Sequence, residues 1–191
     1  MTILVVATGN TGKLKEMQAL LADLDWELRL KPTELEVEET GTTFAENACL
    51  KASQVALATG EWAIADDSGL EVEALDGAPG VFSARYAEND AACIARLLKE
   101  LEGESNRAAR FACAIAIARP DGTIALQAKG FCLGEILRSP QGVGGFGYDP
   151  VFYSPAHQLS FAEMPAEIKR SISHRGKAFQ QLISRLTALS K

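Results

Sequence analysis

The pattern of apolar and polar residues along the chain alternates between strand-like and helix-like segments. Residues 3–7 are an uninterrupted apolar run, which predicts a strand buried on both faces. After the turn TGNTGK at residues 8–13, apolar residues recur at helical spacing and predict a helix that ends near Leu24. Trp26–Leu30 is predicted to be a second strand. This order places a helix N-terminus directly after a glycine-containing turn.

The next segments of the chain continue this alternation. Residues 34–42 are acidic and irregular, and Thr43 with Glu46 has the spacing of a capping box, which predicts a helix that runs to about Ala58. A short buried strand is expected at residues 63–65, running into Asp66-Asp67-Ser68-Gly69.

The second half of the chain carries the same kinds of signal. Asn89 or Asp90 can cap a helix, and the turn at Pro120-Asp121-Gly122 predicts a hairpin. Further segments are a glycine-dense loop at 142–147, a short strand at 151–153 and a final helix at 175–189. Because helices and strands interleave throughout, the predicted class is α/β. The 191 residues, without a low-complexity linker, suit a single domain over 1–191, with one core or two lobes.

Charge and composition narrow the function classes. The formal net charge of -6 argues against a general nucleic-acid or anionic-membrane binder, although a local pocket can still hold a small anion. The apolar run at the N-terminus is too short for a signal peptide or a membrane span. The four cysteines form no C-x-x-C motif, so they are expected to be small core residues of a reduced, cytoplasmic protein.

The turn TGNTGK is the first candidate for chemistry. A glycine turn at a helix N-terminus offers backbone N–H groups and a partial positive charge, and Lys13, Thr8 and Asn10 add side-chain donors for a phosphate. The spacing is not that of a Walker A loop, because Leu14 stands where Ser or Thr would meet magnesium. An ordinary strand–helix turn remains the alternative.

The second candidate is the pair Asp66 and Asp67. Neighbouring side chains on an extended segment point to opposite sides, so the two carboxylates are expected to have different roles. Carboxylates beside a buried strand need a cation or hydrogen bonds, and magnesium is the natural oxygen-liganded partner. A second acidic cluster at Glu36, Glu38 and Glu39 favours metal-assisted phosphoryl chemistry. The alternative is a solvated Asp-Asp-Ser-Gly turn.

Two later segments suit a nucleotide. The glycines of GVGGFGYDP precede a strand and not a helix, so they are not a dinucleotide-binding fingerprint. They are predicted to form a loop that displays Phe146, Tyr148 and Asp149, whose aromatic rings could stack on a base and whose carboxylate could pair with it. A structural loop with a core aromatic is the alternative. Basic residues before the last helix oppose its dipole and could meet phosphate or base oxygens, or could be a solvated helix start. They are Lys169, Arg170, His174 and Arg175.

Taken together, five ordered segments resemble the inosine triphosphate pyrophosphatase family, the Ham1-like XTP/dITP diphosphatases. They are TGNTGK, EETGTTFAENACLKA (38–52), IADDSGLEVEALDGAPGVFSARY (64–86), GGFGYDPVF (144–152) and ISHRGKA (172–178). The resemblance covers essentially the whole chain. It implies an elongated, mixed, twisted sheet flanked by helices, with two lobes and an active-site cleft between them. It also implies a cytoplasmic homodimer that hydrolyses ITP, dITP or XTP to the monophosphate and pyrophosphate with Mg²⁺, cleansing the nucleotide pool.

The resemblance also assigns roles to residues. Glu38 and Asp67 would hold Mg²⁺, Asp67 would accept the proton of the attacking water, and Asp66 and Lys13 complete the predicted catalytic set. Substrate would be bound by Thr8, Gly9, Asn10, Thr11, Gly12, Lys13 and Ser68, and around the base by Phe146, Gly147, Tyr148, Asp149, Lys169, His174 and Arg175. A like-charge neighbour would favour a protonated Asp67 and magnesium would oppose it, and the sequence leaves this balance open.

Two other functions fit part of the pattern. One is a Maf-like pyrophosphatase of modified or canonical nucleotides. The other is a nucleotide sensor without turnover, which the paired carboxylates disfavour because a pure anion site gains nothing from negative charge near phosphate.

Overall fold

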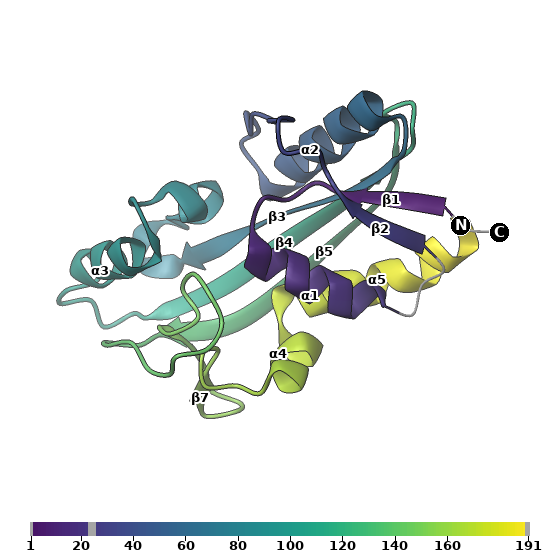
Figure 1. Ribbon diagram of the computed structural model, residues 1–191. Helices are drawn as coiled ribbons and strands as arrows, with labels where there is room; N and C mark the ends of the chain where they lie inside the picture. The colour runs from purple at the N-terminus through teal and green to yellow at the C-terminus, as the bar shows by residue number, and fades with distance from the viewer. Residues whose placement is uncertain (1, 23–25, 190–191) are drawn as a thin grey trace. The chain divides into compact units, whose positions relative to one another are not determined.

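The computed structural model describes residues 2–22 and 26–189, and its elements follow one another in the order shown in Figure 1. The strands are β1 (Thr2–Val6), β2 (Trp26–Leu30), β3 (Trp62–Val72), β4 (Ala108–Ala118), β5 (Ile124–Ile136), β6 (Phe152–Ser154) and β7 (Leu159–Ser160). The helices are α1 (Thr11–Leu21), α2 (Phe44–Thr59), α3 (Asp90–Glu100), α4 (Ala166–Ile172) and α5 (His174–Leu189), with 3₁₀ turns at Glu73–Leu75 and Gly80–Arg85.

The seven strands form one mixed sheet in the order β2-β1-β3-β4-β5-β6-β7. Strand β1 pairs in parallel with both β2 and β3, whereas β6 pairs antiparallel with β5 and β7. Parallel neighbours need a crossover, and helices α1 and α2 lie in the two crossovers along the chain. The predicted α/β class with a mixed sheet is therefore confirmed.

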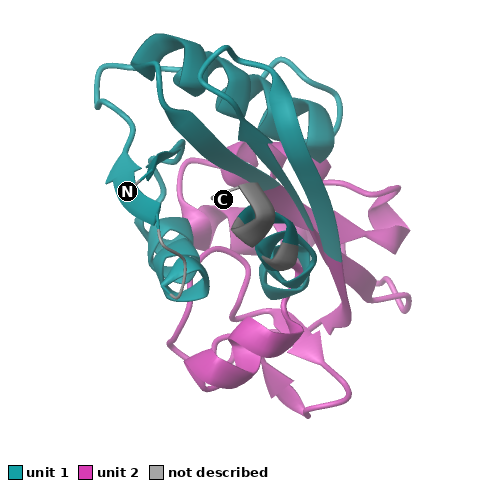
Figure 2. Ribbon diagram, turned by 90° about the vertical axis from the view of Figure 1, so that its right-hand side faces the viewer, with its two compact units in different colours: residues 1–67, 113–130, 175–191 teal, residues 68–112, 131–174 magenta. Residues whose placement is uncertain are grey.

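The chain divides into two compact units, coloured separately in Figure 2. Unit 1 comprises residues 1–67, 113–130 and 175–191, and unit 2 comprises residues 68–112 and 131–174. Strands β3, β4 and β5 contribute residues to both units. The cleft that the family resemblance implies stays a prediction.

In unit 1, helices cover both faces of the sheet because successive strand residues point to opposite sides. Helices α1 and α5 pack on the face that carries Leu4, Val6 and Ile64, and α2 packs on the face that carries Ala63 and Ala65 (Figure 1). The α2 face of the sheet is rich in alanine, as is α2 itself, so helix and sheet approach closely there. Consecutive residues of β3 therefore meet two different helical environments.

Unit 2 has its own core. Helix α3 buries Ile94 and Leu97, and N-cap Asn89 accepts a hydrogen bond from the Ala92 amide, as the sequence predicts. Three phenylalanines from different strands and a loop pack together, namely Phe111, Phe152 and Phe161. This aromatic cluster lies next to several of the predicted site residues.

Local signals in the sequence are confirmed where neighbouring residues decide the structure. The capping box of Thr43 and Glu46 is present, and the hairpin of β4 and β5 turns at residues 119–123. The short elements α4 and β7 have no counterpart in the prediction. The predicted helix end at Leu24 lies outside the described residues. No described helix has the length and apolar character that crossing a membrane requires.

Candidate active site

The Asp66-Asp67 pair lies inside a strand and not at the end of one. Strand β3 runs from Trp62 to Val72, so the predicted end of the strand at residue 65 was wrong. The solvated Asp-Asp-Ser-Gly turn, the alternative to a functional carboxylate pair, was wrong as well. Asp66 is 1% exposed and Asp67 is 5% exposed. Two carboxylates can occupy these buried positions because Asp66 has two cationic partners and Asp67 has one cationic and one amide partner.

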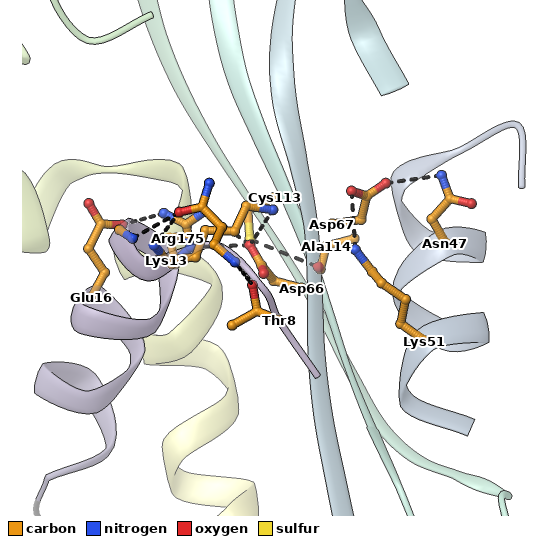
Figure 3. A network of polar contacts seen from close by, with 12 residues as sticks. Thr8, Lys13, Glu16, Asn47, Lys51, Asp66, Asp67, Cys113, Ala114 and Arg175 are labelled. Carbon is orange, nitrogen blue, oxygen red and sulfur yellow. Dashed lines mark hydrogen bonds and ion pairs between the residues drawn. The ribbon is translucent and has the colours of Figure 1, made fainter. Parts of the chain in front are cut away.

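Asp66 lies on the α1 and α5 face of β3, in contact with two cations (Figure 3). Its Oδ2 is 3.0 Å from Arg175 Nη2, 3.2 Å from Arg175 Nε and 3.3 Å from Lys13 Nζ. The Arg175 guanidinium also donates to the Glu16 carboxylate. Burial alone would raise the pKa of Asp66, but Lys13 and Arg175 hold it well below its usual range. Asp66 is therefore ionised at neutral pH.

Asp67 lies on the α2 face with a different set of donors (Figure 3). The amide of Asn47 donates to its Oδ2 at 3.1 Å, and Lys51 Nζ is 3.5 Å from its Oδ1. Lys51 is shared, because its ammonium also donates to Glu39 at 2.5 Å. Burial raises the pKa of Asp67, and Lys51 offsets this only in part. Burial is thus the main cause of the raised pKa of Asp67, and the opposing effect of magnesium stays a prediction.

The turn at residues 8–13 ends in a well-capped helix. Asn10 is the N-cap of α1, and its Oδ1 accepts hydrogen bonds from the amides of Gly12 and Lys13. Thr8 Oγ1 accepts from the Asn10 amide. Two of the amides expected to face a phosphate are thus bonded to Asn10 in this structure. The Lys13 ammonium is the group of this turn that reaches Asp66.

The acidic segment at residues 34–42 has no helix or strand. Glu39 is linked to Asp67 through Lys51, whereas Glu36 and Glu38 are exposed. The assignment of Glu38 as a metal ligand stays a prediction.

In unit 2 the predicted base-binding residues form a charged and aromatic group. Lys169 donates to Asp149 Oδ2 at 2.6 Å, and its ammonium lies 4.9 Å from the centre of the Phe146 ring. Asp149 Oδ2 also accepts from the Phe146 amide. Gly145 has a φ of +73°, and a Cβ there would collide with the Asp149 carboxylate. Glycine at this position thus lets the loop fold onto Asp149.

The other predicted site residues of unit 2 make hydrogen bonds and ring contacts within that unit. The Tyr148 hydroxyl donates to the Ser83 carbonyl, and the Gly147 amide donates to Asp90. The His174 ring stacks on Phe111, with 4.7 Å between ring centres. Ser68 follows Asp67 on β3 and belongs to unit 2. Arg175 follows His174 in sequence but belongs to unit 1, as do its partners Asp66 and Glu16.

Three residues of the site were not found by sequence reasoning. They are Glu16, Asn47 and Lys51. Asn47 and Lys51 lie four residues apart on α2, which places them on one helix face. That spacing, directly after a capping box and on an alanine-rich helix, was the signal in the sequence that could have identified Asn47 and Lys51.

Comparison with known proteins agrees with this architecture. A family model described as the Ham1 family matches residues 4–185. A "dITP/XTP pyrophosphatase" of Nostoc sp. is 68% identical over 98% of this chain and 95% of its own length. One of Synechocystis sp. is 62% identical over 96% and 94%. The structure of a HAM1 protein from Coxiella burnetii superposes with a TM-score of 0.90 at 46% identity, covering 98% of this chain and 100% of that one. The chain therefore belongs to the Ham1 family.

Proposed function

We propose that this protein hydrolyses non-canonical purine nucleoside triphosphates (ITP, dITP or XTP) to the monophosphate and pyrophosphate, with Mg²⁺. The observation that carries the proposal is the pair of buried carboxylates on β3, each held by its own lysine on opposite faces of the strand. The names of the close relatives supply the substrate class.

Lys13 is suited to neutralise the triphosphate. In the proposed reaction, water attacks the α-phosphorus and negative charge grows on the departing pyrophosphate and on the nonbridging oxygens. The Lys13 ammonium is held at the start of α1 by Asp66, so it is placed before substrate binds. Its side chain is 16% exposed, so it is not fully enclosed by the protein.

Asp67 is suited to accept the proton of the attacking water. A general base works best when its pKa approaches the working pH, and burial shifts the pKa of Asp67 in that direction. Asp66 has its pKa shifted the opposite way and is bonded to cations, so it is the poorer base of the two. We therefore assign proton transfer to Asp67, and to Asp66 the role of holding the Lys13 ammonium in place.

The donor set fits a magnesium ion that arrives with the nucleotide. The described residues contain no group of three or more His, Cys, Asp or Glu side chains that could hold a metal alone. Mg²⁺ commonly binds through one or two carboxylates together with substrate phosphates. Asp67 and Glu38 would supply these carboxylates, and the bound ion would neutralise charge on the phosphates.

The unit 2 group is suited to a purine base. The Phe146 ring offers a stacking face, and Asp149, Lys169 and His174 offer polar edges. Hypoxanthine and xanthine present a 6-oxo acceptor where adenine presents a donor. A protein donor at this position accepts the first two and leaves unpaired groups against adenine, a mismatch that can reach about 10⁴-fold. Arg175 is the second predicted donor.

The family resemblance further supports a cytoplasmic homodimer. Light scattering coupled to size-exclusion chromatography tests the dimer directly.

The decisive experiment identifies the phosphate product from ITP, dITP, XTP, GTP and ATP, with and without Mg²⁺. We expect pyrophosphate from the first three, little turnover of ATP, and loss of activity after chelation. Efficient hydrolysis of canonical nucleotides would favour the Maf-like alternative. Binding of ITP without pyrophosphate release would favour the sensor.

A further inference from the structure

Asn47 is a fully buried polar side chain with both ends of its amide engaged. It lies in the first turns of α2 and is 0% exposed. Its Oδ1 accepts from the Gly41 amide at 2.8 Å, and its Nδ2 donates to Asp67 Oδ2 at 3.1 Å. These partners fix the amide orientation, because the Gly41 N–H needs an acceptor and the carboxylate needs a donor.

This arrangement links the acidic segment to the candidate base. Gly41 lies near the end of the acidic segment that carries Glu38 and Glu39, and Asp67 lies on β3. The approach is close, since a Cβ on Gly41 would lie 2.7 Å from Asn47 Oδ1 and 2.7 Å from Glu46 Cβ. The capping box directly before Asn47 fixes where α2 starts and hence the direction in which residue 47 points.

The two oxygens of Asp67 have different partners, and this sets the rotation of the carboxylate. Lys51 contacts Oδ1, but its ammonium is shared with Glu39. The neutral amide of Asn47 contacts Oδ2 and is committed to it. Asn47 therefore fixes the rotation of the Asp67 carboxylate without adding charge to the site.

We propose that Asn47 is a positioning residue that orients the Asp67 carboxylate and couples it to the acidic segment at Gly41. This role rests on the proposed function, because it requires Asp67 to act in catalysis. Groups that orient ligands and bases commonly affect rates by about 10- to 100-fold.

A double-mutant cycle tests the role. Variants Asn47→Ala, Asp67→Ala and their combination are assayed for ITP hydrolysis and for thermal unfolding, with Val55→Ala as the matched control. Val55 is buried on the same helix but belongs to the alanine-rich core. We expect Asn47→Ala to lower kcat at least about tenfold with less than about a threefold change in KM, and Val55→Ala to change neither by more than about twofold. In the Asp67→Ala background, Asn47→Ala should change the residual rate by less than about twofold.

A second variant covers a failure of Asn47→Ala to fold. Asn47→Asp is isosteric and keeps the acceptor for Gly41, but it replaces the amide donor by a carboxyl group that repels Asp67 or shares its proton, so we expect kcat to fall at least as far. Wild-type kcat in Asn47→Asp, or an equal loss with and without Asp67, overturns the inference. Coupling between Asn47 and Asp67 that appears in thermal unfolding but not in kcat also overturns the inference, because it shows a contact with a structural role only. Inactive wild-type protein would instead overturn the proposed function.

Discussion

Asp66 and Asp67 are adjacent on β3, yet their carboxylates face different helices and experience opposite electrostatic effects. Asp66 is close to two cations, Lys13 and Arg175, and they hold its pKa well below its usual range despite burial. Asp67 has one lysine, which it shares with Glu39, and burial raises its pKa. One strand thus places a carboxylate with a lowered pKa beside one with a raised pKa.

The first prediction is that the two Asp→Asn substitutions change stability in opposite directions at neutral pH. Asp66→Asn removes the buried partner of Lys13 and Arg175, which should lower the free energy of unfolding by about 3 kcal/mol. Asp67→Asn removes a charge that is unfavourable where it is buried, which should raise it by about 1 kcal/mol. Urea unfolding with a chelator present measures both values. Shifts of the same sign would contradict the assignment.

The second prediction concerns the pH dependence of these differences. The pKa of Asp67 is higher in the folded protein than in the unfolded chain, so wild type loses stability as pH rises through that interval. The advantage of Asp67→Asn should therefore be full at neutral pH and vanish below the ordinary Asp pKa of about 3.9. Asp66 has a lowered pKa, so its contribution is present above about 3.9 and is lost as pH falls further. Unfolding midpoints of wild type and of the two Asp→Asn variants, measured between neutral and acid pH, give the pH dependence of each stability difference. The same pH dependence for both variants would refute the prediction.

The third prediction is a loss of activity that is separate from stability. Asp67→Asn should cut the rate on ITP by at least about 100-fold, because the variant lacks the proposed base and proposed metal ligand. Circular dichroism should show an unchanged fold. Near-normal turnover by a folded variant would remove Asp67 from the mechanism.

Sequence reasoning worked where residues close in the chain decide the structure. The strand Trp26–Leu30 was predicted with its observed bounds, and the capping box at Thr43 correctly marked the start of α2. The alternation rule also predicted that Asp66 and Asp67 serve different faces. In each case the signal is contained within a few residues.

Sequence reasoning failed where residues distant in the chain offset the free-energy cost of burying a local group. Two adjacent aspartates indicate the end of a strand, but β3 continues because Arg175, 109 residues away from Asp66, offsets the burial of one carboxylate. Asn47 and Lys51 do the same for the other carboxylate from α2. Helix α4 has only seven residues, too few for helical periodicity to stand out.

The fourth prediction is that Arg175 contributes strongly to stability. Its side chain is 2% exposed and bonds to both Asp66 and Glu16, so Arg175→Ala leaves buried negative charge poorly compensated. We expect a loss of about 3 kcal/mol, equivalent to a fall of about 9 °C in Tm for a chain of this size. Arg185→Ala is the control, because Arg185 lies exposed on the same helix and donates to the Gln127 carbonyl. Calorimetry that shows equal Tm values for the two variants would argue against a buried ion-pair network.

The fifth prediction uses two glycines of unit 2 that both have a positive φ. Gly145 has a φ of +73°, and a methyl group there would collide with the Asp149 carboxylate. Gly103 has a φ of +81°, and a methyl group there meets no atom within 4 Å among the described residues. Alanine at either position carries a backbone cost of about 1 kcal/mol. Only Gly145→Ala should also displace Asp149 from Lys169 and the Phe146 amide.

Steady-state kinetics on ITP separates the two effects. If Asp149 and Lys169 shape the base site, Gly145→Ala should raise KM at least about tenfold, because a displacement of about 1 Å in a binding group is costly. Gly103→Ala should keep the wild-type KM, since Gly103 follows α3 and contacts none of the proposed substrate-binding residues that the structure describes. Equal KM values for both variants would show that the contact between Asp149 and Lys169 does not serve the nucleotide, because the backbone strain is common to the two substitutions and only the collision differs.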